Sequence, residues 1–415
     1  GEKFKEDVFT FKTPKYELAT QDGENADMED SRDLVLRPEF TAPVCRYFIQ
    51  NEISQEPKPL KIYYIGPCFR YDKPAPGRYR EFFQVGVEIF GTNTPICDAE
   101  LIYIALSSVE RTGIDDYIVR INDLNILRNL LLDYEVSESI QDKIIGIMDK
   151  ANGDLIKVQL GLMEEEQGNI IGIFLDELGQ LDLSSELNMK LEKMLSLSGK
   201  YEDILPRAQE IFKGNEKALA ALEESSLLAV ESFLNVAGVD SYVVDLSLAR
   251  GLDYYTGIVF EIDSPSLGKQ KQICGGGRYD KLISEFGGEE TAATGFAFGL
   301  DRLVLAADAN GFFKDDIQKP RADVFLFGFS PELHTSLFKM QEKLINAGLR
   351  VELHVSNWKI KRALQFASKL GFHFTIILGD KEQKEGMVTL KNLDTGDQEK
   401  VTLSEAISIM KTELL

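Results

Sequence analysis

The spacing of hydrophobic and polar residues divides the chain into three kinds of segment. Alternation of period two, with a few apolar helices between, predicts a sheet built from residues before 135 and after 240. Between them, Leu and Ile recur at helical spacing among Glu and Lys, which predicts long amphipathic helices from about Val136 to Leu234. After the polar stretch 313–320, which ends in proline, strands and helices alternate again.

The pattern also predicts individual elements. Before residue 313 these are strands at 7–13 and 34–37, a helix at 44–53, a hairpin over 65–88, a helix at 98–112, strands at 117–121 and 240–263, and a strand, glycine turn and helix over 293–305. The last segment is predicted as a compact α/β unit. Its elements are strand 323–329, helix 331–347, strand 350–355, a basic helix ending near Gly371, strand 372–378, a hairpin through 394–396 and a helix from Ser404.

The hairpin over 65–88 carries side chains that suit a ligand. Its first run ends at Arg70, a basic loop with Pro and Gly follows, and alternate residues of the return strand share a face. One face consists of Phe82, Gln84, Gly86 and Glu88, and the other, predicted to be buried, of Phe83, Val85 and Val87. A ring, an amide and a carboxylate beside a cationic loop suit a base, phosphates and a small polar substrate. A surface hairpin with solvated Arg and Lys is the alternative.

Polar groups also interrupt the apolar run 248–261. Arg250 is followed by Asp253, Tyr254 and Tyr255 in a stretch that otherwise reads as a buried strand. Buried polar groups are costly unless they are satisfied by one another or by a ligand. This stretch is therefore a candidate binding segment.

Two shorter stretches are candidates for contacts with a small substrate. Glu39 and Thr41 lie two residues apart before a predicted helix, so in an extended segment both could hold an ammonium group. A helix-start turn, with Glu near the positive end of the dipole, is the alternative. The glycines at 275–277, just before Tyr279, allow close approach of the backbone to a substrate, and a flexible loop is the alternative.

Length and composition restrict the class of protein. A chain of 415 residues can form two or three domains, each with its own core. It has no apolar run of 18 or more residues and no signal-peptide pattern at its start, so a cytosolic protein without membrane contact is expected. The four cysteines are far apart and include no C-x-x-C pair, which indicates neither a zinc site nor a disulfide framework.

Charge is distributed unevenly along the chain. The net charge of −22 argues against nonspecific coating of nucleic acid. From Arg321 onwards, however, 13 Lys and Arg face 12 Asp and Glu, so a nucleic-acid contact is expected there or on local patches of the body. All three histidines, at 334, 354 and 373, also lie in this segment, and no P-loop or G-x-G-x-x-G motif occurs. Any ATP site in residues 1–320 must therefore be built without a histidine, a P-loop or a G-x-G-x-x-G motif.

Taken together, these segments resemble the class II aminoacyl-tRNA synthetases, most closely the histidyl-tRNA synthetases. Residues 7–14 resemble motif 1, the hairpin motif 2, and Ala293–Leu305 motif 3, while 248–261 and 275–280 resemble the two histidine-specific signatures. Asp72 and Asp301 stand where the family commonly has Glu. The sequence also lacks a family segment upstream of 7 and a strand between 28 and 32.

The resemblance implies an α+β fold. It consists of a mostly antiparallel class II catalytic core, a helical insertion that approaches the acceptor stem, and a C-terminal α/β anticodon-binding domain. The corresponding boundaries are 1–135 with 235–312 for the catalytic domain, 136–234 for the insertion, 313–320 for a linker and 321–415 for the last domain. A helical spacer is the alternative for the insertion.

The resemblance also implies an activity, in which histidine and ATP with Mg²⁺ give histidyl-adenylate, and the histidyl group then passes to tRNA(His). A homodimer would form through the motif 1 region. The implied catalytic residues are Arg70, at the α-phosphate, and Arg250, which stabilises the transition state. The implied ATP-binding residues are Arg70, Arg78, Phe82, under the adenine, and Arg302, at the terminal phosphates. The implied histidine-binding residues are Glu39, Thr41, Arg70, Gln84, Glu88, Arg250, Tyr254, Tyr255 and Tyr279.

Within the last set, Glu39, Thr41 and Gln84 would hold the amino-acid head. Glu88 lies four residues beyond Gln84 on the same strand face, so a substrate held at Gln84 would extend its side chain towards Glu88. Our hypothesis is that Glu88 and Tyr255 pair with the two imidazole nitrogens.

In the last domain, Trp358, Lys359, Lys361 and Arg362 combine a ring with three cations, which suits stacking and phosphate pairing with tRNA. Solvated surface is the alternative for this cluster. A second function also stays open, that of the inactive paralogue that serves as regulatory subunit of ATP phosphoribosyltransferase. That paralogue generally lacks the signature Arg and the C-terminal domain, and both are present here. A sister class II synthetase is a further alternative.

Overall fold

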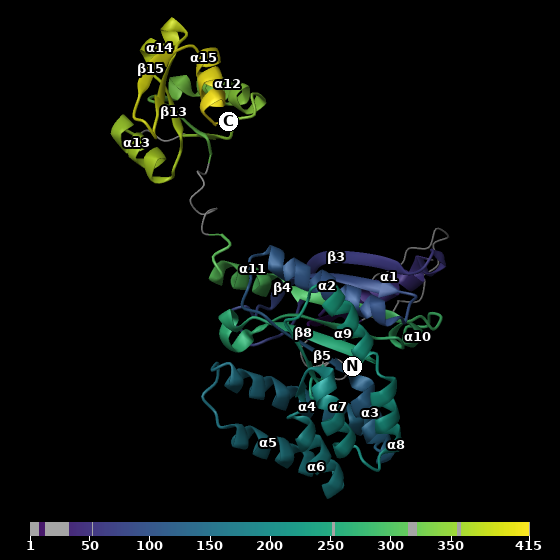
Figure 1. Ribbon diagram of the computed structural model, residues 1–415. Coiled ribbons are helices and arrows are strands. Elements are labelled where there is room, and N and C mark those ends of the chain that lie inside the picture. The colour runs from purple at the N-terminus through teal and green to yellow at the C-terminus, as the bar shows by residue number, and fades with distance from the viewer. Residues whose placement is uncertain are drawn as a thin grey trace, which may run out of the picture. The chain divides into compact units, whose positions relative to one another are not determined.

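The computed structural model describes residues 8–12, 33–51, 53–250, 254–313, 322–354 and 358–414. It divides into two compact units, Gly1–Phe312 and Phe313–Leu415 (Figure 1). Residues 7, 13 and 14 of the predicted motif 1 segment lie outside the described residues. A short strand, β1 (Thr10–Lys12), is described and pairs with β2 (Asp33–Val35).

An eight-stranded sheet forms the centre of the described part of unit 1. Its order is β3 (Leu60–Phe69), β4 (Glu81–Phe90), β10 (Ala293–Gly299), β9 (Gln272–Arg278), β8 (Ile258–Asp263), β5 (Ile118–Asp123), β7 (Tyr242–Asp245) and β6 (Ser198–Gly199). Neighbouring strands are antiparallel except for β5 and β7, which are parallel. The mostly antiparallel core expected from the sequence is confirmed.

Helices cover this sheet, and of those below only the helix Leu124–Asp133 was not predicted from the sequence. Helix α1 (Thr41–Gln50) follows the turn after β2, and α2 (Pro95–Arg111) lies along β8, β9 and β10. Helix α3 (Leu124–Asp133) continues from β5, and its first turn is capped by the Asp123 carboxylate, which accepts from the Asn125 amide at 3.0 Å. Helix α11 (Leu300–Ala309) follows β10, as the predicted strand–turn–helix requires.

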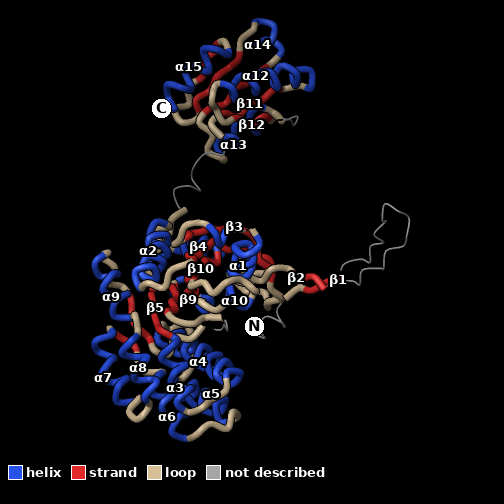
Figure 2. Tube along the Cα trace, turned by 90° about the vertical axis from the view of Figure 1, so that its right-hand side faces the viewer, coloured by secondary structure: helices blue, strands red, loops and turns tan. Residues whose placement is uncertain are grey.

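The segment 136–234 is helical, as its 3.6-residue pattern predicts. It contains α4 (Glu138–Gln159), α5 (Gln167–Gly179), α6 (Ser185–Met194), α7 (Tyr201–Ile211), α8 (Glu216–Glu224) and α9 (Leu227–Val236). In Figures 1 and 2, α4 to α8 form a layer below the sheet. Helix α8 packs on α3 and α9 on α2, so this layer is joined to the helices that cover the sheet.

The structure differs from one local prediction and from one alternative. The predicted strand 240–263 is broken, because β7 ends at Asp245 and β8 begins at Ile258. The intervening described residues, including Arg250 and Tyr254, therefore lie in connecting segments where polar side chains need not fit into a ladder. Conversely, the glycines at 275–277 belong to the central strand β9 rather than to a flexible loop. A Cβ on Gly276 would lie 2.4 Å from the carbonyl oxygen of Gly295 on the neighbouring strand.

The outer face of the hairpin also differs from expectation. Phe83 was predicted to be buried but is exposed, while Val85 and Val87 are half-buried. Opposite them on β3, Tyr63 is 81% and Ile65 63% exposed. An apolar sheet face is thus left uncovered in the described part of this single chain.

Unit 2 is the predicted α/β unit. Its sheet has the order β12 (Val351–Leu353), β11 (Val324–Gly328), β13 (Phe374–Leu378), β14 (Val388–Asn392) and β15 (Gln398–Val401), the first three parallel. Its helices are α12 (His334–Asn346), α13 (Ile360–Lys369), the short α14 (Asp380–Glu385) and α15 (Leu403–Leu414). Strand β11 is buried on both faces, with Leu326 in one hydrophobic cluster and Phe325 in the other, as expected for a parallel strand between helix layers.

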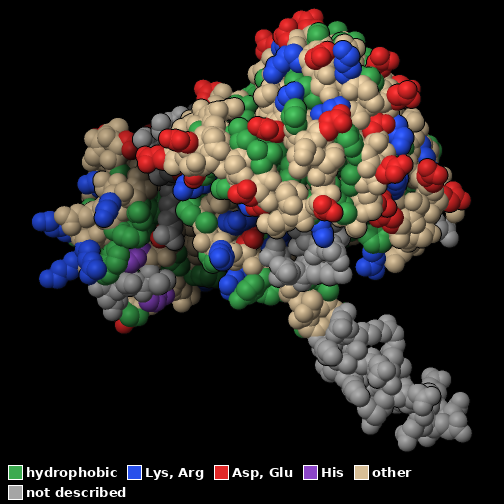
Figure 3. Space-filling model, turned by 90° about the horizontal axis from the view of Figure 1, so that it is seen from below, with side chains coloured by type: hydrophobic (Ala, Val, Ile, Leu, Met, Phe, Trp, Pro, Cys, Tyr) green, Lys and Arg blue, Asp and Glu red, His purple; other side chains and the backbone are tan. Residues whose placement is uncertain are grey.

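Surface charge follows the sequence division. Figure 3 looks onto the helical layer of unit 1, where Asp and Glu side chains are spread among fewer Lys and Arg. On unit 2, at the left of the same view, Lys and Arg side chains gather near histidines. Across the part of the chain that is described, none of the helices is both long enough and apolar enough to traverse a lipid bilayer.

Candidate active site

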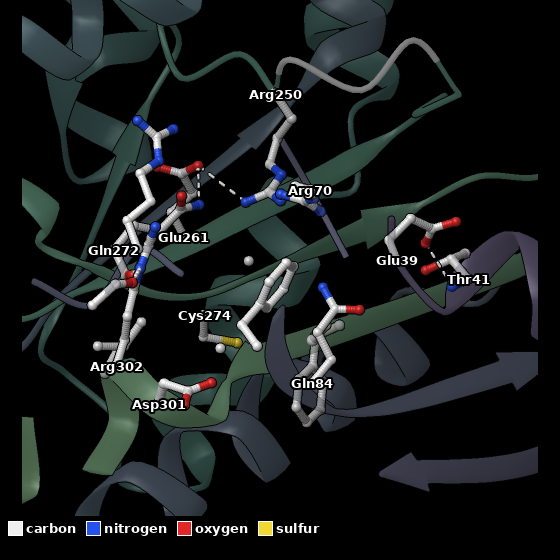
Figure 4. A pocket seen from close by; sticks show the side chains of 18 of the residues that line it. Glu39, Thr41, Arg70, Gln84, Arg250, Glu261, Gln272, Cys274, Asp301 and Arg302 are labelled. Carbon is white, nitrogen blue, oxygen red and sulfur yellow. Dashed lines mark hydrogen bonds and ion pairs between the residues drawn. The ribbon is translucent and has the colours of Figure 1, made fainter. Parts of the chain in front are cut away.

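A pocket of about 310 Å³ in unit 1 brings together most of the predicted site residues. It is lined by side chains from the hairpin, the start of α1, β9, β10, α11 and helix α4. The predicted residues that line it are Glu39, Thr41, Arg70, Arg78, Phe82, Gln84, Arg250, Tyr254, Tyr255 and Arg302. In the view of Figure 4, Glu39 and Thr41 lie at one end, Arg302 and Gln272 at the other, and Arg70 and Arg250 between.

Glu39 caps a helix and also faces the pocket. Its carboxylate accepts hydrogen bonds from the backbone amides of Thr41 at 2.6 Å and Ala42 at 2.9 Å, in the first turn of α1. The helix-start alternative is thus the observed local structure. Burial raises the pKa of Glu39, and these two amide bonds partly oppose the shift. A carboxylate at a pocket wall with its orientation fixed by amides is a suitable partner for a cationic group.

Glu88 is fully buried and does not line the pocket. Its Oε1 accepts a hydrogen bond from Thr41 Oγ1 at 3.0 Å, and its Oε2 accepts one from the hydroxyl of Tyr279, which also lies behind the wall. Burial raises the pKa of Glu88 from 4.5 to about 8, although the bonds from Tyr279 and Thr41 oppose the shift. In the free protein this carboxyl group is therefore largely protonated near neutral pH.

A glycine separates Glu88 from the pocket. Gly295 lines the pocket and is paired with Glu88 across β10 and β4. A Cβ on Gly295 would lie 1.5 Å from Glu88 Oε2, so the carboxylate occupies the space of the missing side chain. Tyr254 and Tyr255 line the same pocket with their rings 4.8 Å apart. The residues predicted to read a side chain are thus collected at one place, with Glu88 directly behind the wall.

Guanidinium groups line the middle of the pocket and its Arg302 end. Arg70 lies over the Phe82 ring at 5.1 Å and donates to the Pro38 carbonyl at 2.8 Å. Arg302 donates to the carbonyls of Gly77 at 2.8 Å and Gln272 at 3.0 Å. These carbonyl bonds fix the arginines without neutralising their charge.

The arginines at this end also repel one another. The pKa of Arg302 is lowered by burial and then by the neighbouring charges of Arg78 and Arg70, with Asp72 opposing. Burial also lowers the pKa of Arg70. Asp72 pairs with Arg78 at 3.2 Å, and Asp301 accepts the Phe83 amide at 2.8 Å, so the two shorter carboxylates are used in the site wall. A group of neighbouring, mutually repelling cations, of which Arg70 and Arg302 are half-buried, favours a polyanionic ligand.

Arg250 lies between the two ends. Its Nη1 donates to Glu261 Oε1 at 3.0 Å, and the same oxygen accepts from Gln272 Nε2 at 2.6 Å (Figure 4). A Cβ on Gly275 would lie 1.6 Å from Arg250 Nη1. The room left by this glycine is therefore filled by the arginine, whereas the sequence interpretation assigned it to a substrate. Although burial alone lowers the pKa of Arg250, interactions with Tyr255, Glu261 and Asp149 raise it overall.

Sequence reasoning missed several pocket residues. Glu261, Gln272 and Cys274 line the pocket from β8 and β9, where they sit among apolar neighbours. Glu261 carried a usable signal, because a carboxylate within an apolar strand requires a partner. Asp149 lines the pocket from α4, within the segment in which the sequence indicated no chemistry. One Asp on an amphipathic helix carries no such signal.

The predicted tRNA-binding cluster lies in unit 2. Lys359, Lys361 and Arg362 are exposed, and the Arg362 guanidinium lies 4.6 Å from the centre of the Trp358 ring. Trp358 is half-buried against His354 and Phe366, with ring distances of 4.1 and 5.1 Å. Its packing with the core leaves the cations as the accessible part of the cluster.

Comparison with known families decides between the candidates. Residues 24–303 match the family model described as Histidyl-tRNA synthetase, which covers more than half of the chain. The chain belongs to the histidyl-tRNA synthetase family. Residues 323–413 match a second model, Anticodon binding domain, which confirms the interpretation of unit 2.

Individual members of the histidyl-tRNA synthetase family support this assignment. The chain is 37% identical over 377 residues to the histidine--tRNA ligase of Methanocaldococcus jannaschii, covering 90% of this chain and 82% of that protein. It is 34% identical over 386 residues to that of Pyrococcus furiosus, covering 92% and 84%. The fold is similar to the crystal structure of histidyl-tRNA synthetase from Nostoc sp. PCC 7120, with TM-score 0.65, 24% identity, and coverage of 96% and 86%.

Proposed function

We propose that the chain is a histidine--tRNA ligase. It joins L-histidine to the α-phosphate of ATP, releasing pyrophosphate, and then transfers the histidyl group from the adenylate to the terminal ribose of tRNA(His). The observation that carries this proposal is the pocket, in which carboxylate and amide groups at one end and three arginines at the other flank Arg250. Phosphoryl-type transfers depend on positioning and charge neutralisation, which this lining supplies.

We assign the carboxylate end to histidine. Glu39, Thr41 and Gln84 hold its ammonium and carboxyl groups, and Glu39 is already oriented by two backbone amides. The imidazole lies beside Tyr254 and Tyr255, with Glu88 reaching it past Gly295 and Tyr279 holding the Glu88 carboxylate. An amino acid whose side chain lacks the two imidazole nitrogens would leave the buried polar groups there unpaired. Each unpaired group would cost roughly 1–3 kcal/mol of binding free energy.

We assign the arginine end to ATP. Phe82 stacks under the adenine, Arg70 pairs with the α-phosphate, and Arg78 and Arg302 hold the terminal phosphates. The carboxylate oxygen of histidine attacks the α-phosphorus, the bond to the bridging oxygen breaks, and pyrophosphate leaves with that oxygen. Negative charge grows on the non-bridging oxygens during this step, and Arg250 stabilises it.

Mg²⁺ fits this site as a companion of ATP. Within the described residues, no group of three or more His, Cys, Asp or Glu side chains could hold a metal ion on its own. Mg²⁺ usually binds to one or two carboxylates together with substrate phosphates and water, and Asp72 and Asp301 line the phosphate end. When bound, the ion neutralises phosphate charge.

We infer further that two copies associate through the first strands of unit 1. Phe11, Leu34 and Val35 on β1 and β2 are exposed, as are Tyr63 and Ile65 on β3. An uncovered apolar face of this kind is typical of a protein interface. The proposed partners in addition to a second copy are tRNA(His), contacted in part by Trp358, Lys359, Lys361 and Arg362, and the proposed location is the cytosol.

The regulatory paralogue is the weaker candidate. One similar crystal structure, of a Bacillus halodurans protein, is described as that of an ATP phosphoribosyltransferase regulatory subunit/histidyl-tRNA synthetase, with TM-score 0.64 and 24% identity. This similarity concerns the fold alone. Arg250 in the pocket and the match of unit 2 to an anticodon-binding domain both favour the ligase.

Histidine-dependent ATP–pyrophosphate exchange by the purified chain tests the proposal. We expect exchange with histidine and none with other amino acids, and Arg250→Ala should lower the rate of adenylate formation by roughly 10²–10³ with little change in histidine binding. The rate loss follows because Arg250 acts on charge that exists only in the transition state. Binding of histidine without exchange by the wild-type chain would favour the regulatory paralogue, and equal losses of affinity and rate in Arg250→Ala would make Arg250 a binding residue.

A further inference from the structure

Arg250 projects from a connecting segment, and its orientation depends on groups that other elements supply. Strand β8 supplies Glu261, whose Oε1 accepts from Arg250 Nη1 at 3.0 Å, and β9 supplies the room at Gly275. Helix α4 supplies Asp149, which lines the same pocket and interacts electrostatically with Arg250. The guanidinium is thus bonded to one carboxylate, Glu261, and shares the pocket with a second, Asp149, from another element.

The same helix makes a second contact with the sheet one turn later. Asn152 is three residues after Asp149, so the two side chains lie on one face of α4. Asn152 is 4% exposed, and its Nδ2 donates to Asp245 Oδ2 at 2.9 Å and Ser247 Oγ at 2.7 Å. Its Oδ1 accepts a hydrogen bond from Arg120 Nη1. Both the nitrogen and the oxygen of the Asn152 side-chain amide are thus hydrogen-bonded inside the protein.

Arg120 connects Asn152 with the pocket residue Glu261. Its side chain is 1% exposed, and Nη2 donates to Glu261 Oε2 at 2.8 Å and to Asp263 Oδ2 at 3.0 Å. Glu261 therefore holds Arg120 with one oxygen and Arg250 with the other. A continuous chain of buried and part-buried polar contacts leads from Asn152 on α4 through Arg120 and Glu261 to Arg250. Loss of one member changes the partners that remain for the next, so a change at Asn152 can reach Arg250 through Arg120 and Glu261.

We propose that helix α4 positions Arg250, directly through Asp149 and indirectly through Asn152, Arg120 and Glu261. The helical segment 136–234 is then part of the catalytic apparatus, because its first helix holds the group that acts at the α-phosphate. Asp149 and Asn152 are positioning residues, since they act through Arg250. This inference rests on the proposed function.

The direct test compares two aspartates of one helix. Asp149→Asn keeps the shape of the side chain and removes its charge, whereas Asp154→Asn is a matched control, because Asp154 pairs with Lys157 at 2.8 Å and does not line the pocket. Pyrophosphate exchange is measured at saturating and limiting histidine and ATP. We expect Asp149→Asn to lower kcat about tenfold, with both KM values within about twofold of wild type, and Asp154→Asn to match wild type.

A double-variant cycle separates positioning from an independent effect. If Asp149 acts only through Arg250, adding Asp149→Asn to Arg250→Ala should lower the exchange rate by less than about twofold further, because the group it positions is already absent. Asn152→Ala should repeat the pattern, a kcat loss that disappears in the Arg250→Ala background. A fold defect would instead add to the loss of Arg250.

The outcomes are distinct. Equal kinetics for Asp149→Asn and Asp154→Asn, a raised KM with unchanged kcat, or a further tenfold loss in the double variant would each overturn the positioning role while leaving the proposed function intact. Absence of histidine-dependent exchange in the wild-type chain would overturn the proposed function, and the inference with it.

Discussion

At the scale of single residues, ionisable side chains at the pocket fill the space left by glycines. The Arg250 guanidinium occupies the position of a Cβ on Gly275, and the Glu88 carboxylate that of a Cβ on Gly295. Both glycines are in strands, where glycine weakens the sheet. The two glycines leave room for two ionisable side chains within the layer of the sheet, close to the pocket. This arrangement gives two predictions.

The first concerns Gly275→Ala. The added Cβ would lie 1.6 Å from Arg250 Nη1, the far end of a long side chain that can move, so the fold should tolerate the change. Arg250 would be displaced from Glu261, and we expect the rate of adenylate formation to fall by roughly tenfold or more. Exchange kinetics and the melting temperature are measured together. A melting temperature that falls sharply, or an unchanged rate, would contradict this account of Gly275.

The second concerns the titration of Glu88. Its pKa is 4.5 ordinarily and about 8 in the folded protein, so between these values the folded chain holds a proton that the unfolded chain releases. Stability from this group is therefore full below pH 4.5 and falls as pH rises to about 8, by at most about 1.4 kcal/mol per pH unit. Glu88→Gln has no proton to lose. Its melting temperature relative to wild type should rise between pH 5 and 8, and a constant difference would contradict the shift.

The same variant tests the role of Glu88 in histidine recognition. Gln keeps the shape of the side chain but cannot provide a carboxylate to an imidazole N–H, so histidine activation should weaken at least about tenfold while the KM for ATP stays nearly unchanged. Pyrophosphate exchange against histidine at several pH values measures this. A wild-type KM for histidine throughout would remove Glu88 from the imidazole site.

At the scale of elements, the sequence correctly predicts those helices and strands that a local hydrophobic pattern determines. The hairpin, the strand–turn–helix of β10 and α11, and the helices of 136–234 occur where their periodicity indicates. The predicted strand 240–263 is interrupted between β7 and β8, where Arg250 contacts Glu261 and lines the pocket together with Asp149. Such distant partners leave no local pattern. For the same reason Asp149 could not be found. Glu39, Arg70 and Arg250 could be, through motifs that the family shares.

The exposed hairpin face shows what two-residue alternation in a strand does not predict. Alternation separated Phe82 from Phe83 correctly, but it does not say which face a partner covers. If two copies associate through this region, Ile65→Lys should weaken the dimer at least tenfold, because a charge would be buried without a partner. Sedimentation velocity measures the association, and Met189→Lys, at an exposed apolar position of α6, is the control. Equal association of both variants would move the interface elsewhere.

At the scale of the whole molecule, the two units separate two kinds of chemistry. Every residue assigned to histidine or ATP belongs to unit 1, which has its own sheet and core. Residues 321–415 carry 13 basic and 12 acidic side chains, against 33 and 56 in the rest. Phosphate contacts need cations that are not already balanced, so the strongly acidic unit 1 repels RNA except at local patches. Unit 2 therefore offers the better surface for phosphate contacts with tRNA.

This division predicts the effect of removing unit 2. A chain ending at Pro320 should keep histidine-dependent pyrophosphate exchange within a few fold of wild type and should show a KM for tRNA(His) raised roughly tenfold or more. In the full chain, replacing Lys359, Lys361 and Arg362 by Ala should raise that KM in the same direction. Replacing the exposed Lys381 and Lys384 of α14 controls for charge. A truncated chain that folds but shows no exchange would mean that the pocket depends on unit 2. Equal KM values for tRNA in the cluster variant and in the Lys381 and Lys384 control would place the tRNA contact outside the cluster at 358–362.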